Sequence, residues 1–213
     1  SSGENMGIRT KAVLTRMNNP IGNMIGNSLE IVETIQTLSG NGPKDTLELL
    51  YALGGVLLVS AKICNSMDDA KARIESTIKD GSALNKFKEM IHWQGGDSRV
   101  TEPDKMWQIL GVANCITPIY SEKTGYIQKI DAMKLGIISQ KLGAGRINLG
   151  DTVKSKVGIE LNKQVGDFVK SGELIAKIHS EEEICDEELK IFLSAIDFSE
   201  SDVESIPRII QIY

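Results

Sequence analysis

Apolar residues recur every three or four positions through most of the first 97 residues, and this spacing predicts amphipathic helices. Ser66, with Asp69 three residues later, is typical of a helix N-cap, and Ser39-Gly40 is typical of a helix end. Before these helices, the apolar run Ile8–Thr15 predicts a short buried strand. The expected helices extend from Leu29 to Leu38, Thr46 to Ile63, Ser66 to Gly81 and Ser82 to Trp93.

The helical periodicity fades between residues 98 and 114, and a mixed pattern follows. Residues 173–179 alternate apolar and polar side chains, which predicts a strand covered on one face only. The segment GDTV at 150–153 recurs as GDFV at 166–169. Each copy is expected to turn at its glycine and to start an extended segment with its valine inward. We expect further strands at Ile116–Tyr120, Tyr126–Ile130 and 208–213, and helices at Asp131–Leu142 and Ile184–Ile196.

The composition is typical of an ordinary globular protein, with 41% hydrophobic and 25% charged residues. The net charge of -5 argues against nucleic-acid binding, which needs clustered lysine and arginine, and the acidic run 181–188 is expected to be exposed. No apolar run approaches the roughly 20 residues that a membrane span needs. Cys64, Cys115 and Cys185 form no CxxC pair, so we predict neither disulfides nor a zinc site and expect a reducing, cytoplasmic location.

The segment RMNNPIGNMIGNSLE, residues 16–30, places Gly22 and Gly26 four residues apart ahead of a helix. Glycines in this position can cradle a phosphate. However, a Walker loop needs GxxxxGK[ST] and a dinucleotide loop needs GxGxxG, and neither is present. The other interpretation is structural: both glycines allow close backbone packing where a strand turns into a helix. The residues favour this second interpretation.

Two further features could carry chemistry. The stretch DAMKLGII, residues 131–138, resembles the attachment site of biotin carrier modules, which would place Lys134 at an exposed hairpin tip. The simpler interpretation is a helix with Lys134 facing solvent, because the second GDxVxxG turn of such carriers is missing. His92 and His179 are far apart and have no nucleophile motif beside them. The residues alone predict no complete active site.

Four stretches, in the same order, resemble the thymidine phosphorylase and pyrimidine nucleoside phosphorylase family. The resemblance covers nearly the whole chain and is weakest at residues 98–115. The matching stretches are GIRTKAVLTRMNNPIGNMIGNSLEIVETIQTLSGNGPKD (7–45), DGSALNKFKEMIHWQGGD (80–97), AMKLGIISQKLGAGR (132–146) and VGIELNKQVGDFVKSGELIAKIH (157–179).

The resemblance implies a division of the chain. Residues 1–97 would be the end of an α/β glycosyltransferase domain, residues 98–114 a linker, and residues 115–213 the family's C-terminal α+β domain. The implied fold class is an α/β remnant followed by an α+β domain with a small mixed, turn-rich sheet, similar to a barrel-sandwich hybrid.

The resemblance also implies an activity. The intact enzyme would be a cytoplasmic homodimer that converts thymidine, deoxyuridine or uridine, with phosphate as co-substrate and no organic cofactor, into free base and (deoxy)ribose 1-phosphate. The family's phosphate-binding segment and base-contacting residues match nothing in this chain, and we expect them upstream of Ser1. We therefore expect a fragment that has no catalytic or substrate-binding residue and is inactive alone. The alternative is a non-catalytic interaction protein derived from the family.

One family site does map onto this chain. Some bacterial members bind a cation through two backbone carbonyls of the loop and one helix carboxylate, and the matching positions are Ile21, Met24 and Glu33. A hard cation such as potassium or calcium prefers oxygen ligands, and a glycine-permitted turn can direct carbonyls toward it. The remaining ligands would come from upstream. Arg16 departs from the family, since many members have an acidic residue there.

Overall fold

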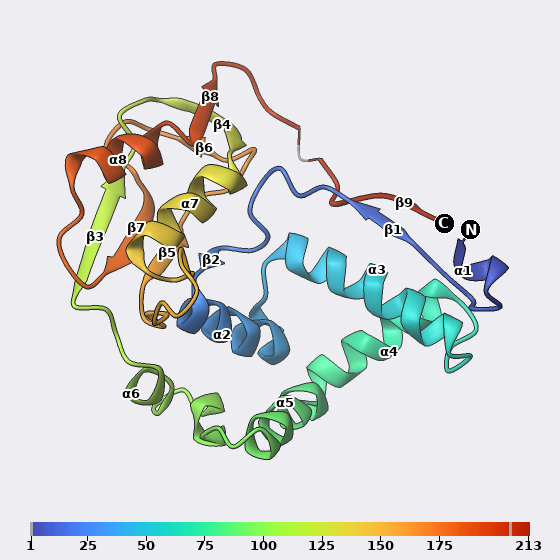
Figure 1. Ribbon diagram of the computed structural model, residues 1–213. Coiled ribbons are helices and arrows are strands. Elements are labelled where there is room, and N and C mark those ends of the chain that lie inside the picture. Colours follow the sequence, from blue (N-terminus) through green and yellow to red (C-terminus); the bar gives the residue numbers. More distant parts are fainter. Residues whose placement is uncertain (1, 205) are drawn as a thin grey trace.

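The computed structural model describes residues 2–204 and 206–213. In Figure 1, a row of helices runs below and beside a group of short sheets, and the two chain ends lie close together. The row consists of α2 (Asn27–Gln36), α3 (Lys44–Ser60), α4 (Met67–Lys79), α5 (Ser82–Trp93) and α6 (Met106–Leu110). The group of sheets, called the C-terminal domain below, contains β3 (Cys115–Tyr120), β4 (Gly125–Ile130), α7 (Ala132–Leu142), β5 (Gly158–Leu161), β6 (Phe168–Val169), β7 (Leu174–Ser180), α8 (Asp186–Leu193) and β8 (Ile196–Ser199).

The helices begin and end close to where the sequence predicts, because their caps are local. The Ser66 hydroxyl accepts the Asp69 N–H at 3.1 Å and caps α4. The Asp131 carboxylate accepts the N–H groups two and three residues later and caps α7. Gly143 ends α7 in the left-handed conformation, with φ of 104°. Each signal lies within four residues of the helix end that it sets.

The strand pairings among the described residues are antiparallel, so the predicted mixed sheet is wrong. The strand orders are β2-β5-β7-β3 and β6-β4-β8, where β2 is Met24–Ile25. The segment 162–173 between β5 and β7 contains no crossover helix, and it includes β6, which pairs with β4 in the other sheet. The loop that carries Gly22 and Gly26 contains β2, which is an edge strand of the main sheet of the C-terminal domain.

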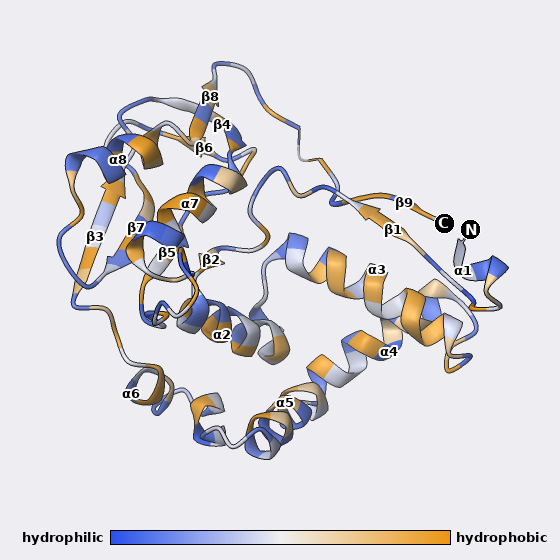
Figure 2. Ribbon diagram, in the orientation of Figure 1, coloured by the Kyte–Doolittle hydropathy of each residue, from blue (hydrophilic) through white to orange (hydrophobic). Residues whose placement is uncertain are grey.

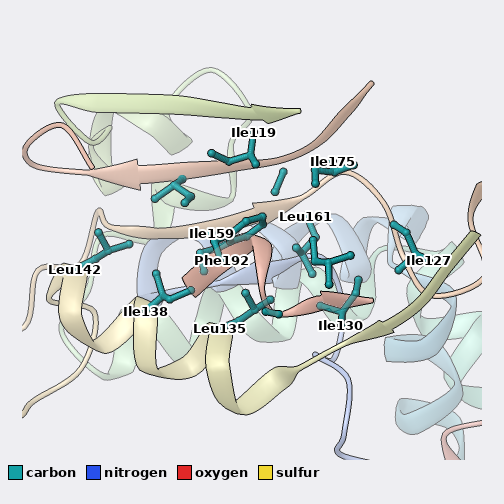
Figure 3. Packing of buried hydrophobic residues seen from close by; sticks show 14 of the residues in the cluster. Ile119, Ile127, Ile130, Leu135, Ile138, Leu142, Ile159, Leu161, Ile175 and Phe192 are labelled. Carbon is teal, nitrogen blue, oxygen red and sulfur yellow. The ribbon is translucent and has the colours of Figure 1, made fainter. Parts of the chain in front are cut away.

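The core of the C-terminal domain lies between its sheets and its helices. Figure 3 shows Leu135 and Ile138 of α7 packed against side chains from β4, β5 and α8. Ile127, Ile159 and Phe192 belong to the same cluster, and all five of these side chains are fully buried. This cluster holds the two sheets together.

Two strand predictions in this domain need correction. Both faces of β7 are largely covered, since Ile175 and His179 are buried on one face and Ala176 and Ile178 on the other. Ile175 on one face and Ile178 on the other both belong to the buried cluster of this domain. The first repeat is also wrong, because Val153 lies in irregular chain before β5. In the second repeat Val169 is fully buried in β6, as predicted.

The strand expected at Ile8–Thr15 is shorter and more exposed than predicted. It spans Val13–Thr15 (β1) and pairs antiparallel with β9 (Ile209–Ile212), which confirms the predicted last strand. Leu14 is 47% exposed. Figure 1 shows this two-stranded ribbon beside α3 and away from the C-terminal domain. In the part of the chain that the structure describes, β1 has no partner strand besides β9, so it cannot form a buried sheet.

The helical row has a small core of its own. Val32 and Ile35 of α2 pack with Val100 and Met106, which come from the segment predicted as a linker. That segment contains a 3-10 turn, Ser98–Thr101, as well as α6. Figure 2 shows hydrophobic positions along α3, and two of them, Leu53 and Leu57, are exposed. No helix among the described residues is both long and apolar enough to span a membrane.

Candidate functional site

The loop at residues 16–26 joins the two parts of the molecule, and its glycines are needed for close approach. A Cβ atom added to Gly22 would lie 2.1 Å from the Glu33 carboxylate. One added to Gly26, where φ is 135°, would lie 2.5 Å from the Val157 carbonyl oxygen in the C-terminal domain. The Gly26 contact is with backbone and leaves no room for a side chain, whereas the Gly22 contact is with the end of the Glu33 side chain, which can move. The predicted role in close backbone packing is therefore confirmed for Gly26, while Gly22 adopts the left-handed conformation, with φ of 68°, that favours glycine.

Glu33 projects from α2 into the loop. Its side chain is buried, and its carboxylate accepts the Asn23 N–H at 2.6 Å. Burial raises the pKa of the Glu33 carboxyl and the nearby Asp45 carboxylate raises it further, while the N–H groups of Asn23 and Met24 act in the opposite direction. Glu33 forms no ion pair among the described residues, so this carboxylate suits a positively charged ligand.

Asp45 lies in the first turn of α3 and holds the loop from the other side. Its carboxylate accepts the Gly22 N–H at 3.0 Å. The same oxygen accepts Arg208 Nη2 at 2.7 Å, and Arg208 lies in the tail immediately before β9. Gly22 thus lies between two acidic side chains, Glu33 and Asp45, and Asp45 is paired with the Arg208 guanidinium.

The C-terminal domain also binds the loop directly. Gln164 Nε2 donates to the Gly22 carbonyl at 2.8 Å and to the Asn23 side-chain oxygen at 2.7 Å. The Asn23 carbonyl accepts the Leu161 N–H at 2.7 Å, which extends the pairing of β2 with β5. The loop is consequently fixed by hydrogen bonds from three separate parts of the chain: α3, the tail and the C-terminal domain.

Two cavities open beside the loop. The larger, of about 1130 Å³, lies between the loop, the start of α3, the C-terminal domain and the tail. The smaller, of about 790 Å³, is lined by the loop, α2 and α7. Neither cavity is lined by a histidine or cysteine among the described residues, and the larger one combines charges of both signs with amide side chains. Its charged lining residues are Arg16, Lys44, Asp45, Glu48, Lys129, Asp167, Asp197 and Arg208.

The three predicted cation ligands come from the loop before β2, from β2 and from α2. Ile21 precedes Gly22, Met24 begins β2, and the Met24 N–H faces the Glu33 carboxylate. No group of three or more histidine, cysteine, aspartate or glutamate side chains that could hold a metal occurs in the described residues. A cation at Glu33 would therefore depend on backbone carbonyl oxygens, and it stays a prediction.

The other sequence candidates are not brought together. Lys134 lies in α7, and its Nζ donates to the Ser194 carbonyl at 2.7 Å. The hairpin tip that a biotin carrier requires is absent there, so that alternative is not supported. His179 is buried in β7, with Nε2 3.4 Å from the Glu160 carboxylate, whereas His92 is exposed on α5. The acidic run is exposed over most of its length, as predicted.

The pair of Arg208 and Asp45 was not predicted, and sequence reasoning had little basis for it. The two residues are separated by 163 positions, so no local motif connects them. The available signal was weak: Arg208 is a lone basic residue in the otherwise mainly apolar segment IPRIIQIY. A charged side chain in such a segment needs a partner if it is buried.

Comparison with known proteins agrees with the predicted family. Residues 126–199 match the family described as pyrimidine nucleoside phosphorylase C-terminal domain. The chain is 44% identical over 179 residues to the pyrimidine-nucleoside phosphorylase of Staphylococcus epidermidis, which covers 84% of this chain and 40% of that protein. It is 38% identical over 199 residues to the enzyme of the same name from Staphylococcus aureus, covering 93% of this chain and 45% of that protein.

A third relative, from Staphylococcus haemolyticus, has the same name and is 39% identical over 190 residues. The chain spans less than half the length of each of these curated relatives. The family resemblance predicted from the sequence is confirmed by these matches, and the C-terminal domain is where the family model applies.

Proposed function

We propose that this chain forms the C-terminal part of a pyrimidine-nucleoside phosphorylase. The intact enzyme would use phosphate to cleave the glycosidic bond of a pyrimidine nucleoside, giving the free base and (deoxy)ribose 1-phosphate. One observation carries the proposal: the similarity to relatives of this name runs through both the helical row and the C-terminal domain, over 84–93% of the chain. A cytoplasmic homodimer, expected from the resemblance, is part of the same proposal.

In this proposal, the chain supplies positioning rather than the reacting groups. The phosphate-binding and base-contacting residues of the family would come from a part of the enzyme that precedes residues 7–45. The contribution of the described residues is a rigid loop, held by Asp45 and Gln164, next to a polar cavity. A fixed loop of this kind can orient substrate-binding elements without taking part in bond cleavage. We further infer that the two facing sheets of the C-terminal domain form a barrel-sandwich hybrid.

The cation site is a second part of the proposal. Ile21 and Met24 would contribute carbonyl oxygens, and Glu33 would contribute a carboxylate. The support is the chemistry of the donors: Glu33 is buried and has no ion pair among the described residues, and the loop beside it is held in one conformation. Potassium or calcium would neutralise this buried charge, and oxygen donors suit both ions.

A chimeric enzyme tests the phosphorylase assignment. The matching 179 residues of the Staphylococcus epidermidis enzyme would be replaced by this chain, and phosphate-dependent release of uracil from uridine would be measured. We expect activity in the chimera and none in the same enzyme lacking that part. A soluble chimera with native-like circular dichroism but no phosphate-dependent release would contradict the proposal. Omitting phosphate provides the reaction control.

Calorimetric titration of this chain with calcium chloride or potassium chloride tests the cation site. With water in place of the upstream ligands, we expect weak but measurable binding by the wild-type chain and its loss in Glu33→Gln, which keeps the shape of the side chain but removes its charge. Glu187→Gln, on an exposed part of α8, is the matched control and should leave binding unchanged. Equal binding by the wild type and Glu33→Gln would show that the ion binds elsewhere.

A further inference from the structure

The tail residue Arg208 is buried to an extent unusual for arginine, with only 7% of its surface exposed. Burying a guanidinium group is costly unless its donors are paired. Nε and Nη2 both donate to the Asp45 carboxylate, at 3.2 Å and 2.7 Å. The two nitrogen atoms on one edge of the guanidinium therefore form a fork on one carboxylate oxygen.

The remaining donors of Arg208 reach the backbone of the glycine loop. Nη1 donates to the Asn19 carbonyl at 2.8 Å and lies 3.4 Å from the Arg16 carbonyl, and Nη2 donates to the Pro20 carbonyl. These carbonyls belong to the stretch immediately before Ile21. The Arg208 side chain therefore holds both the start of the loop and Asp45, whose carboxylate accepts the Gly22 N–H.

Backbone pairing places Arg208 where it can do this. The Arg16 N–H donates to the Arg208 carbonyl at 2.8 Å, and the Ile209 N–H donates to the Glu48 carboxylate at 3.1 Å. The tail is thus bound to the loop on one side and to α3 on the other. These contacts hold the backbone of the tail, while the Arg208 side chain reaches the Asn19 and Pro20 carbonyls.

We propose that Arg208 is a positioning residue of the proposed cation site. Its fork holds Asp45 and the carbonyls of residues 16–20, and thereby sets the conformation of the loop that presents Ile21 and Met24 to Glu33. Arg208 does not contact Glu33 itself. The inference rests on the proposed cation site, but its effect on the loop can be measured without any cation.

The planar guanidinium is essential to this role. Arginine offers five N–H donors in a fixed geometry, whereas lysine offers a single ammonium group. Lysine carries its three donors on one nitrogen atom, so it could not reproduce contacts that Arg208 makes with Asp45 and two carbonyls from three separate nitrogen atoms. A residue that only balanced the charge of Asp45 would tolerate lysine, so this substitution separates positioning from simple charge pairing.

Amide hydrogen exchange of the intact chain, followed by NMR without added cation, tests the effect on the loop. In Arg208→Gln and Arg208→Lys we expect the Gly22 and Asn23 amides to exchange at least about tenfold faster, because the loop loses charge-assisted hydrogen bonds. The Ile127 amide, which is bonded within the C-terminal domain, should keep its rate.

Two control variants make this result specific. Ile212→Gly weakens the pairing of β9 with β1 opposite Val13 and should accelerate the Tyr213 amide, but not Gly22. Arg99→Gln removes an exposed arginine–carboxylate pair with Asp97 and should change none of these amides. Unchanged Gly22 and Asn23 rates in Arg208→Gln would overturn the proposal. Equal acceleration of the Ile127 amide would also overturn it, because the effect would then not be specific to the loop. So would wild-type exchange rates of Gly22 and Asn23 in Arg208→Lys.

Titration with calcium chloride then connects the loop to the cation. We expect Arg208→Gln to weaken calcium binding at least about tenfold, with Ile212→Gly unchanged. Faster loop exchange with unaltered calcium affinity would overturn the link between Arg208 and the site. If the wild-type chain binds neither calcium nor potassium, the ligands of this chain alone do not form a cation site, and the exchange rates of Gly22 and Asn23 still decide whether Arg208 positions the loop.

Discussion

The C-terminal domain and the helical row differ in how completely they bury their apolar residues. In the C-terminal domain, α7 packs against two sheets and buries Leu135 and Ile138 completely. In the helical row, α5 buries no residue fully, and Leu57 of α3 is 70% exposed. Both regions have clear apolar periodicity, so the pattern alone does not decide burial. A helix buries its apolar stripe only where a second layer of structure meets it.

The largest expected effect contrasts a buried with an exposed aliphatic residue. Ile138→Ala should destabilise the C-terminal domain by about 2–5 kcal/mol, since it leaves a cavity in a closed core. Leu57→Ala should change the free energy of unfolding by less than about 0.5 kcal/mol. Urea unfolding followed by circular dichroism measures both. Similar losses for the two variants would mean that the outer face of α3 is packed in solution, and that the two regions do not differ in how they bury apolar residues.

Gly26→Ala tests the junction between the two regions. The added methyl group would meet the Val157 carbonyl, and alanine disfavours the φ of 135° found there. We expect a loss of about 1–3 kcal/mol, as for other backbone-strained positions, and faster amide exchange at the pairing of β2 with β5. Gly136→Ala, in α7 with open space around its Cα, is the matched control and should be neutral or stabilising.

The two helix caps test whether each region unfolds as a unit. Ser66→Ala and Asp131→Ala each remove an N-cap and should each cost about 1 kcal/mol. Loss of the Ser66 cap should accelerate exchange mainly within α4, whereas loss of the Asp131 cap should accelerate exchange throughout the C-terminal domain. Hydrogen exchange with mass spectrometry resolves the two patterns. A uniform response to Ser66→Ala would show that the helical row is as cooperative as the domain.

The smallest expected effect is a pH dependence confined to the C-terminal domain. Burial lowers the pKa of the His179 imidazole, and Lys177 also lowers it, while the Glu160 carboxylate acts in the opposite direction. The unfolded chain therefore takes up this proton at higher pH than the folded chain. The contribution of neutral His179 to the free energy of unfolding is fully present above the ordinary pKa near 6.5. It is lost as the pH falls toward the lowered pKa of the folded state.

Substituting the two histidines isolates this contribution. His179→Gln should reduce the fall in the free energy of unfolding below about pH 6.5, where ordinary histidine begins to titrate. His92→Gln, on the exposed face of α5, should keep the same fall and serves as the control. Urea unfolding at several pH values gives the comparison. An unchanged pH dependence in His179→Gln would show that another group is responsible.

The sequence predicts those parts of the fold that depend on neighbouring residues. The helix ends at Ser66, Asp131 and Gly143 follow from side chains and turns within a few positions. The roles of Gly22 and Gly26 were also predictable in kind, because both lie where a strand turns into a helix. Their particular contacts, with Glu33 and Val157, were not.

Long-range pairing explains what the sequence did not predict. Whether β7 is covered on one face or two depends on what packs against each face of its sheet, which its own alternation does not record. The exposure of β1 depends on its partner β9, at the far end of the chain. The contact of Arg208 with Asp45 likewise joins segments with no sequence relationship. Such contacts become visible only when the packing is known.

We propose that this chain contributes positioning to a phosphorylase whose reacting groups lie in another part of the enzyme. The most direct measurement incubates the purified chain alone with uridine or thymidine and follows free base with and without phosphate. We predict no phosphate-dependent release of uracil or thymine, although the C-terminal domain is folded. Phosphate-dependent release by the chain alone, abolished when phosphate is omitted, would contradict the claim and place the catalytic groups within these 213 residues.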